Sequence, residues 1–305
     1  MGDKMSKYRA WLLLVVTTLF WAGNYVFGKY VIMEMTPLWI TFSRWLIALF
    51  LLIPIAYFLE KPKWQMVKKA WIPLISMGVL GSIGYNMVLY SALAYTSPTN
   101  AALVSALNPA VIVLFSVFLL RERITWLQTS GIVLSLIGAF VLITQGDFGL
   151  ILQHEYNKGD ILMLGAVVIW TLYSIIGRRL TTVLPITATA ASAVFATLIL
   201  APFAIAQGID VTKISHLTMT GILYIAIFPS VFSFIFWNMS IRAIGISQAG
   251  IFLNLIPVFT AIISWILGER ITGTQVLGGS LVFLGVYLTT GMLNHRFAVL
   301  FSNHK

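Results

Sequence analysis

Long apolar runs alternate with short polar connections along the whole chain. A helix needs about 20 residues to cross the roughly 30 Å of hydrocarbon in a bilayer, and ten apolar runs of about that length are bounded by proline, glycine or charge. They cover Trp11 to Tyr30, Leu38 to Leu59, Ile72 to Ala94, Ala101 to Leu120, Trp126 to Thr144, Ile161 to Gly177, Ile186 to Ala206, Leu217 to Asn238, Ala249 to Leu267 and Thr274 to Leu293. The pattern predicts an all-α membrane protein with ten transmembrane helices.

The composition agrees with this pattern. Hydrophobic residues make up 59% of the chain, charged residues 9%, and the mean hydropathy is +0.95, whereas about one-quarter of a soluble domain is charged. The net charge of +10 would fit a nucleic-acid-binding protein, but no soluble stretch is long enough to form a basic surface, so no nucleic-acid partner is expected. There is no cysteine, and the four histidines lie in connecting or terminal segments, so we expect no metal and no cofactor.

The positive charges are distributed unequally between the connections. With Met1 in the cytoplasm, fourteen of the 19 lysines and arginines fall on the cytoplasmic side, four fall on the other side, and Arg44 lies inside a span. Positive charge marks cytoplasmic loops, so we expect a multi-pass protein of the cytoplasmic membrane with both termini in the cytoplasm. The stretch KPKWQMVKK, from Lys61 to Lys69, is interpreted as an element for orientation and lipid headgroups and not as a substrate site.

One polar phrase occurs twice: RERITWLQTSG from Arg121 returns as GERITGTQVLGG from Gly268. Similar offsets relate other positions, such as WAGNYVFGK from Trp21 and WTLYSIIGR from Trp170. The matched pairs include Glu122 with Glu269, Gln128 with Gln275, Gly131 with Gly278, Gly138 with Gly285, Pro37 with Pro185 and Pro54 with Pro202. The chain is therefore interpreted as two copies of a five-span unit, residues 1–145 and 146–305. Because five is odd, the second copy must be inverted in the membrane.

The repeated phrase itself has a structural interpretation. Each copy contains the Thr-x-x-Gln spacing of a helix capping box, beginning at Thr125 and at Thr272. Glu122 and Glu269, in the turns just before, are interpreted as exposed turn charges that need no catalytic role.

Glycines also repeat in both copies. Gly131 with Gly138, and Gly278 with Gly285, recur at a spacing of seven residues, which leaves a stripe of small residues where another helix can approach closely. GVLGSIG, from Gly78, has the same character. We interpret all of these as packing positions, and a hinge is the alternative.

Two prolines lie near the middle of the fourth and ninth expected spans. Pro109 and Pro257 each remove a backbone donor and clash with the carbonyl four residues earlier, at Ser105 and Leu253. Inverted-repeat transporters bind substrates near the midplane beside interrupted helices, and a wet cavity would supply partners for the freed carbonyls. We favour a cavity at these breaks, and an ordinary kink in each helix is the alternative.

Polar and aromatic side chains occur in several spans. An amide in hydrocarbon is destabilising unless it is paired, so these groups should face the protein interior, where some will only link helices. Trp237, near an expected span end, has the alternative role of an interfacial anchor. The candidate substrate-binding residues are Trp21, Asn24, Tyr25, Arg44, Tyr85, Tyr90, Asn108, Trp170, Tyr173 and Asn254.

Arg44 is the only fixed charge well inside an expected span, about six residues or roughly 9 Å from the outer end of the second. A charge inside a span tends to be functional, and a guanidinium could hold a substrate carboxylate or phosphate. Alternatively, Arg44 extends toward the interface or binds carbonyls of a neighbouring helix. Both roles stay open, because the matching position in the second half is Ser192.

Several kinds of chemistry lack the residues that they need. No Asp, Glu or His lies deep in an expected span, so the carboxylate of a proton-coupled pump is not found, and there is no Walker-type loop for ATP. An intramembrane enzyme would need a nucleophile with a base, or a metal cluster, and is not expected. Facilitated diffusion, coupling through a less obvious group and a passive channel all stay open.

Two long tracts carry a family resemblance: YSALAYTSPTNAALVSALNPAVIVLFSVFLLRERITWLQTSGIVLSLIGAFVL from Tyr90, and its echo NMSIRAIGISQAGIFLNLIPVFTAIISWILGERITGTQVLGGSLVFLGVYL from Asn238. With Arg44, Pro109 and Pro257, they resemble the EamA family of the drug/metabolite transporter superfamily. The resemblance covers nearly the whole chain. It implies ten helices with cytoplasmic termini, a central cavity, and spans five and ten toward the periphery.

The same resemblance implies a function. Members export or exchange small metabolites, commonly amino acids and their derivatives, and related branches carry nucleotide sugars or sugar phosphates. The small multidrug branch uses a glutamate in its first helix, and no acid occurs here between Trp11 and Tyr30. We therefore expect a transporter of small metabolites, by alternating access around a central cavity. Its expected partners are a small-molecule substrate and the lipid bilayer, and we expect a monomer and not a dimer.

Overall fold

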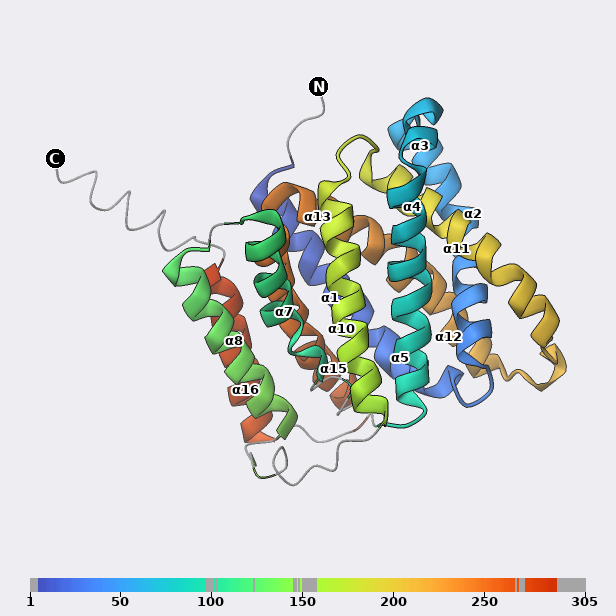
Figure 1. Ribbon diagram of the computed structural model, residues 1–305. Helices are drawn as coiled ribbons and strands as arrows, with labels where there is room; N and C mark the ends of the chain where they lie inside the picture. The colour runs from blue at the N-terminus through green and yellow to red at the C-terminus, as the bar shows by residue number, and fades with distance from the viewer. Residues whose placement is uncertain are drawn as a thin grey trace.

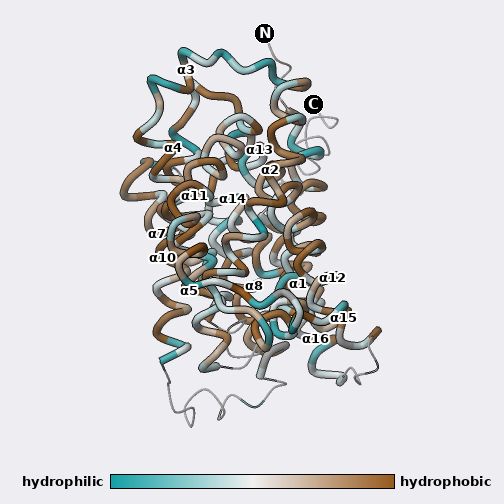
Figure 2. Tube along the Cα trace, turned by 90° about the vertical axis from the view of Figure 1, so that its right-hand side faces the viewer, coloured by the Kyte–Doolittle hydropathy of each residue, from teal (hydrophilic) through white to brown (hydrophobic). Residues whose placement is uncertain are grey.

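The computed structural model describes residues 5–96, 101, 104–122, 124–144, 147, 149, 158–266, 268 and 272–289. These residues form helices and connections, without a strand in any of the described ranges (Figure 1). Seven helices are long and apolar enough to cross a membrane, and three shorter apolar helices accompany them. Hydrophilic positions gather toward the two ends of the bundle, α3 among them (Figure 2). The prediction of an all-α membrane protein is confirmed.

The first two helices of the chain each begin with a side-chain cap. Ser6 accepts from the Arg9 amide at 3.3 Å, and Thr36 accepts from the Trp39 amide at 3.3 Å just before Pro37. The elements are α1 (Lys7–Val31), α2 (Pro37–Glu60), α3 (Trp64–Lys69), α4 (Trp71–Met77), η1 (Gly78–Gly84), α5 (Tyr85–Leu93), α7 (Asn108–Phe115), η2 (Ser116–Leu120) and α8 (Trp126–Thr144).

The second half follows a similar order. Its elements are α10 (Lys158–Arg179), α11 (Pro185–Gln207), η3 (Val211–Lys213), α12 (His216–Ile225), η4 (Ala226–Phe232), α13 (Ser233–Ile244), α14 (Ile246–Gly250), η5 (Ile251–Asn254), α15 (Leu255–Ile266) and α16 (Gly273–Thr289). The helix predicted to end at Asn238 continues six residues further, to Ile244. It ends there because Gly245, with φ of 86°, adopts a backbone conformation that other residues rarely take.

The capping boxes predicted before α8 and α16 are present. The Thr125 amide donates to Gln128 Oε1 at 2.9 Å, and the Gln128 amide donates to Thr125 Oγ1 at 3.3 Å. Thr272 and Gln275 make the same reciprocal pair at 2.9 and 3.2 Å. The repeated phrase therefore begins two helices, as predicted.

Two wide π-helical turns interrupt otherwise continuous helices. The segment η1 joins α4 to α5, and η4 joins α12 to α13, at matching places in the two halves. A π turn leaves carbonyls without their usual helical donor, and side chains supply it here. Asn86 Nδ2 donates to the carbonyls of Gly81 and Ser82 at 3.0 Å, and the Ser230 hydroxyl donates to the Ile225 carbonyl at 2.7 Å.

The prolines near the middle of the fourth and ninth spans mark the start of a helix. Pro109 lies in the first turn of α7 and Pro257 in that of α15, where a missing N–H is tolerated. The Ser105 carbonyl accepts from Asn108 Nδ2 at 2.9 Å, and the Leu253 carbonyl accepts from the backbone N–H at the end of η5. Both carbonyls have protein partners, so the breaks do not by themselves require a water-filled cavity.

The helices α8 and α16 pack backbone to backbone. A β-carbon on Gly131 would lie 2.6 Å from the Gly285 carbonyl oxygen, and one on Gly138 would lie 2.7 Å from the Gly278 oxygen. Gly131, near the start of α8, therefore faces Gly285, in the second half of α16, while Gly138 faces Gly278, so the two helices run antiparallel. The prediction that these glycines are packing positions is confirmed, and the helix that each stripe admits is the other one.

The helices α2 and α11 are also antiparallel neighbours, and hydrogen bonds join them at both ends. At one end, the Thr36 hydroxyl donates to Gln207 Oε1 at 2.7 Å. At the other end, the Glu60 carboxylate accepts from the amides of Ile186 and Thr187 at 2.9 and 2.7 Å. Glu60, the last residue of α2, thus caps the first turn of α11.

Candidate functional site

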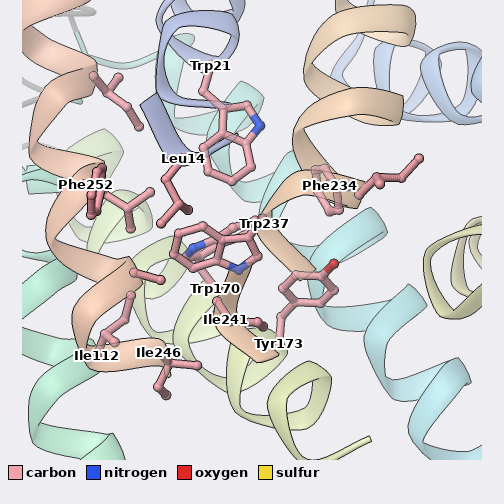
Figure 3. Close-up of a cluster of buried hydrophobic side chains, with 14 of the residues drawn as sticks. Leu14, Trp21, Ile112, Trp170, Tyr173, Phe234, Trp237, Ile241, Ile246 and Phe252 are labelled. Carbon is pink, nitrogen blue, oxygen red and sulfur yellow. The ribbon is translucent and has the colours of Figure 1, made fainter. Parts of the chain in front are cut away.

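An aromatic cluster lies at the middle of the bundle, where helices of both halves meet (Figure 3). The rings of Trp21 from α1 and Trp170 from α10 meet edge to face, with centroids 5.0 Å apart. Trp237 and Phe234 from α13 contact Trp170 at 5.4 and 5.5 Å, and Tyr173 contacts it at 5.0 Å. Aromatic pairs at these separations stabilise a cluster beyond the area that they bury.

The three indole N–H groups of this cluster differ in their partners. Trp21 Nε1 donates to the Pro229 carbonyl at 3.3 Å, and Trp237 Nε1 donates to the Ser174 hydroxyl at 3.1 Å. Trp170 is 3% exposed, yet its Nε1 has no hydrogen-bond partner among the described residues. A buried donor without a partner is destabilising by about 1–3 kcal/mol, so this N–H is a candidate contact for a ligand oxygen.

Arg44 lies at the centre of a polar cluster beside these rings, with 1% of its surface exposed. Its Nε donates to Ser230 Oγ at 2.7 Å, and its Nη1 donates to Asn86 Oδ1 at 2.5 Å and to the Tyr90 hydroxyl at 2.9 Å. The guanidinium also lies 5.6 Å from the ring centre of Trp45. Arg44 therefore does not extend to the interface: its bonds join α2 to α5 and to η4 of the other half.

Two features of Arg44 bear on anion binding. Its Nη2 has no hydrogen bond to any residue that the structure describes, and no described carboxylate pairs with it. A buried cation without a counter-ion is unfavourable unless dipoles surround it, and here a serine, an amide and a phenol do so. The polar cluster around Arg44 contains no carboxylate among the described residues.

Each half of the chain also contains a hydrogen-bonded pair of one tyrosine and one asparagine. The Tyr90 hydroxyl donates to Asn24 Oδ1 at 2.9 Å. In the other half, Asn238 Nδ2 donates to the Tyr173 hydroxyl at 2.6 Å and to Thr189 Oγ1 at 3.0 Å. In the sequence repeat, Tyr90 matches Asn238 and Asn24 matches Tyr173, so the tyrosine and the asparagine have exchanged places between the two halves.

The remaining candidates lie at the helix breaks and beside them. Tyr25 and Ser105 are joined by a 2.8 Å hydrogen bond between their hydroxyls, next to the Asn108 contact with the Ser105 carbonyl. Asn254 Nδ2 donates to Ser135 Oγ at 3.1 Å. The Oδ1 atoms of Asn108 and Asn254 are buried, and neither has a partner within the described ranges. Tyr85 is half-buried and contacts the Trp170 ring at 5.0 Å.

The structure brings most of the candidates predicted from the sequence into contact with one another, but not all of them. Trp21, Tyr85, Trp170 and Tyr173 share the aromatic cluster. Asn24, Arg44 and Tyr90 share the polar cluster, and Tyr25 joins Asn108 through Ser105. Asn254 bonds to Ser135 of α8 and makes no hydrogen bond to another candidate among the described residues.

Sequence analysis missed part of this site. Trp237 is fully buried in the aromatic cluster, so its interpretation as an interfacial anchor is wrong. The anchor role assumed a span ending near Asn238, whereas the helix continues to Ile244. Ser230 was also not recognised, although it lies at the position that matches Ser82 in the paired π turns.

Glu122 is not the exposed turn charge that the sequence indicated. It is half-buried, and its carboxylate accepts from the Ile246 and Ser247 amides at 3.3 and 3.2 Å and from the Ser247 hydroxyl at 2.5 Å. Arg178 lies 3.9 Å away. Glu122 therefore caps the start of α14 in the other half, much as Glu60 caps α11. Glu269, its match in the second half, lies outside the described residues.

Acidic residues join the halves at the opposite end of the bundle as well. Glu34 accepts from the Ser215 amide at 2.8 Å, just before α12. Asp160, 2% exposed in the first turn of α10, accepts from the Thr96 hydroxyl at 2.8 Å. Within the described residues, no group of three His, Asp or Glu side chains could hold a metal ion.

Comparison with known proteins agrees with this architecture. A family model described as the EamA-like transporter family matches the chain twice, over residues 9–144 and 157–291. A solved crystal structure shares the fold, with a TM-score of 0.76 and 21% identity over 94% of this chain and 99% of that one.

Relatives by sequence are transporters. The uncharacterized transporter YyaM of Bacillus subtilis is 30% identical over 95% of this chain and 96% of its own length. A probable amino-acid metabolite efflux pump of Salmonella typhimurium is 27% identical over 93% of this chain and 95% of the pump. The aromatic amino acid exporter YddG of Ancylobacter novellus is 35% identical over 38% of this chain and 40% of its own. The chain belongs to the EamA-like transporter family, and it is a multi-pass membrane transporter and not an enzyme.

Proposed function

We propose that this protein exports or exchanges small metabolites, such as amino acids or their derivatives, by alternating access around the aromatic and polar clusters. In this proposal, ten helices span the plasma membrane as two inverted five-helix repeats, residues 1–145 and 146–305. Both termini lie in the cytoplasm, and the monomer is the working unit. A saturable carrier is preferred over a passive channel because the middle of the bundle is filled by side chains.

The observation that carries the proposal is that matching helices of the two halves contact each other in antiparallel pairs. Gly131 faces Gly285 while Gly138 faces Gly278, and these glycines match crosswise in the sequence repeat. The pair α2 and α11 behaves in the same way. A two-fold axis in the membrane plane brings equivalent helices together in opposite directions, so this packing supports inversion.

The same axis would pass through the substrate site. Trp21 and Trp170 match in the repeat and touch each other, as residues beside a two-fold axis do. Among the described residues, Trp170 Nε1 is a buried donor without a partner, and the Oδ1 atoms of Asn108 and Asn254, at the two helix breaks, are buried acceptors without one. A small molecule that carries both an acceptor and a donor would pair these groups, and the rings would bury its apolar part.

Arg44 has a double role in this proposal. Its Nε and Nη1 hold Ser230, Asn86 and Tyr90 in place, and its Nη2 is available to a substrate carboxylate. This arrangement favours anions and zwitterions over simple amines. The names of the amino-acid metabolite pump and of the aromatic amino acid exporter point to the same class. Sugar phosphates, nucleotide sugars and drugs, which related transporters of the superfamily carry, are the alternative substrates.

The function is tested in two steps on purified full-length protein. A thermal-shift screen against amino acids, sugar phosphates and amines identifies ligands, and vesicles then measure transport of each hit. We expect saturable uptake and counterflow, in which unlabelled substrate inside accelerates entry of labelled substrate. Linear uptake without counterflow would show a passive pore. A response to phosphorylated sugars alone would replace the proposed substrate class.

The topology is tested separately, and the natural chain helps because it has no cysteine. Thr125→Cys and Thr272→Cys place single thiols at the two matching helix starts, and each removes one equivalent cap. Inversion predicts that a membrane-impermeant maleimide labels only one of them in right-side-out vesicles. Equal labelling of both from one side would refute it.

A further inference from the structure

One connection at the end of the bundle has a strong and uncompensated positive charge. We call residues 61–72 the basic loop; it contains α3, which projects beyond the neighbouring helices at the end where α1 begins (Figure 1). It has four exposed lysines and no acidic residue. None of these lysines forms an ion pair with any acid that the structure describes. They are Lys61, Lys63, Lys68 and Lys69.

The nearest acid along the chain cannot neutralise this charge, because another helix uses it. Glu60 directly precedes the loop, but both of its carboxylate oxygens accept hydrogen bonds from the first turn of α11. These three bonds direct the carboxylate toward α11, and it forms no ion pair with a loop lysine in the part of the chain that the structure describes. The loop therefore presents four cationic groups that have no ion-pair partner among the described residues.

Large apolar side chains surround the lysines and are exposed as well. Trp64 is 61% exposed, Trp71 54% and Ile72 60%. Just before the loop, Phe58 on the last turn of α2 is 72% exposed. Tryptophan with neighbouring lysine is the composition of the boundary between lipid hydrocarbon and headgroups, where the ring is buried and the charge stays in water.

We propose that the basic loop binds the anionic phosphate headgroups of phospholipids in the adjoining leaflet. The lysines pair with the headgroup phosphates while Trp64 and Trp71 insert beside the acyl chains. A nucleic acid or an acidic protein would also match the charge, but neither would bury the exposed Trp71 and Ile72, which continue directly into the membrane helix Trp71–Leu93. The bilayer matches both the charge and the apolar surface.

This inference does not depend on the proposed substrate. It rests on the membrane location of the chain and on the contacts at one end of the bundle. A lipid that ties α2 to α4 across the loop would stabilise the junction between the second and third membrane helices. Anionic lipid should therefore raise the apparent melting temperature of the purified protein more than neutral lipid does.

Native mass spectrometry of full-length protein, loaded with equal amounts of phosphatidylglycerol and phosphatidylcholine of the same acyl chains, tests the proposal. We expect retained phosphatidylglycerol to exceed phosphatidylcholine. The variant K63Q/K68Q/K69Q should lower that preference at least tenfold, since each lysine near the surface contributes about fivefold. The control K29Q/K158Q/K213Q removes the same charge from lysines outside the loop and should change the preference less than twofold.

Each result has a defined meaning. An unchanged preference in K63Q/K68Q/K69Q, or an equal loss in the control, would overturn the proposal. If glycerol phosphate in solution stabilised the protein as much as the lipid does, a free anion would replace the bilayer lipid as the ligand. Should the loop variant fail to fold, sodium chloride titration of the wild-type protein decides instead: bound phosphatidylglycerol must fall steeply with salt, and salt-independent retention would refute an electrostatic site.

Discussion

The hydroxyl of Tyr90 donates to Asn24 at 2.9 Å while it accepts from Arg44 at the same distance. The matching positions in the second half, Asn238 and Tyr173, make the reverse pair, with the amide as donor and the phenol as acceptor. One half therefore uses its tyrosine to hold a guanidinium by a hydrogen bond, whereas Tyr173 accepts from Asn238 and makes no hydrogen bond to a cation among the described residues. The two halves keep one framework but differ in charge at the site.

The Tyr90 hydroxyl provides a first test. Tyr90→Phe keeps the ring and removes the hydroxyl that links Arg44 Nη1 to Asn24, which leaves a buried donor and a buried acceptor with one bond fewer each. We expect a loss of about 1–3 kcal/mol in the free energy of unfolding. Tyr173→Phe is the matched control: it removes one neutral bond to Asn238, so its loss should be smaller. Equal losses would contradict a special role for the Arg44 contact.

Two substitutions separate the contribution of the shape of Arg44 from that of its charge. Arg44→Lys keeps the charge but cannot make the three bonds to Ser230, Asn86 and Tyr90, whereas Arg44→Gln also removes the charge. If Arg44 contacts the substrate, Arg44→Gln should weaken binding of anionic ligands about tenfold or more beyond any effect on neutral ligands, measured by thermal shift. Reduced folded yield with unchanged ligand preference would assign Arg44 a structural role only.

The glycine contacts between α8 and α16 make a sharp stability prediction. A β-carbon on Gly138 would lie 2.6 Å from the Val282 nitrogen, a backbone atom that can move only if the helices separate. Gly138→Ala should therefore lower stability by about 1–3 kcal/mol. The control is Gly165→Ala in α10, where nothing lies within 4 Å. It should be neutral or slightly stabilising, because alanine favours a helix by about 1 kcal/mol over glycine. Both are read from thermal unfolding in detergent.

The acidic caps predict a further pair of effects. Glu122→Gln replaces one carboxylate oxygen with an NH2 group, which cannot accept, so either the Ile246 amide or the Ser247 donors lose their acceptor and the start of α14 loses part of its cap. We expect about 1–2 kcal/mol of destabilisation, from loss of the cap and of the favourable charge at a helix start. Asp210→Asn, at an exposed pair with Lys213, is the control and should change stability by less than about 0.5 kcal/mol. If Glu122→Gln destabilised the protein no more than Asp210→Asn does, Glu122 would be only an exposed turn charge.

Glu34 predicts a dependence on pH. The Ser215 amide donates to its carboxylate and lowers the pKa of Glu34 below the ordinary value of 4.5. A carboxyl whose pKa is lowered by folding stabilises the protein above its unfolded pKa, and this contribution disappears as the pH falls through the folded value. Wild type should therefore melt above Glu34→Gln at pH 7, and the gap should close as the pH falls below about 4.5. A gap that stays constant as the pH falls below about 4.5 would contradict the assignment.

Local and periodic features were predictable because they need only the residues within a few positions. The apolar runs, the boxes at Thr125 and Thr272, and the glycine stripes all depend on helix length and period. Membership of a site was harder to predict. Asn24, Arg44 and Tyr90 were named as candidates from three separate spans, but the sequence offered no measure of how they are bonded to one another.

The sequence by itself determined that this chain is a bundle of membrane helices built from a repeated unit, because hydrocarbon thickness and backbone hydrogen bonding leave an apolar chain few choices. Only the tertiary structure decided which polar groups pair. Arg44 finds Ser230 at 186 positions' distance and Glu122 finds Ile246 at 124. Burial of Trp237 likewise depends on Trp21 in another helix. Residues so far apart in the sequence come into contact only through the packing of helices. The periodicity of a helix does not show which other helix packs against it, so these partners could not be predicted.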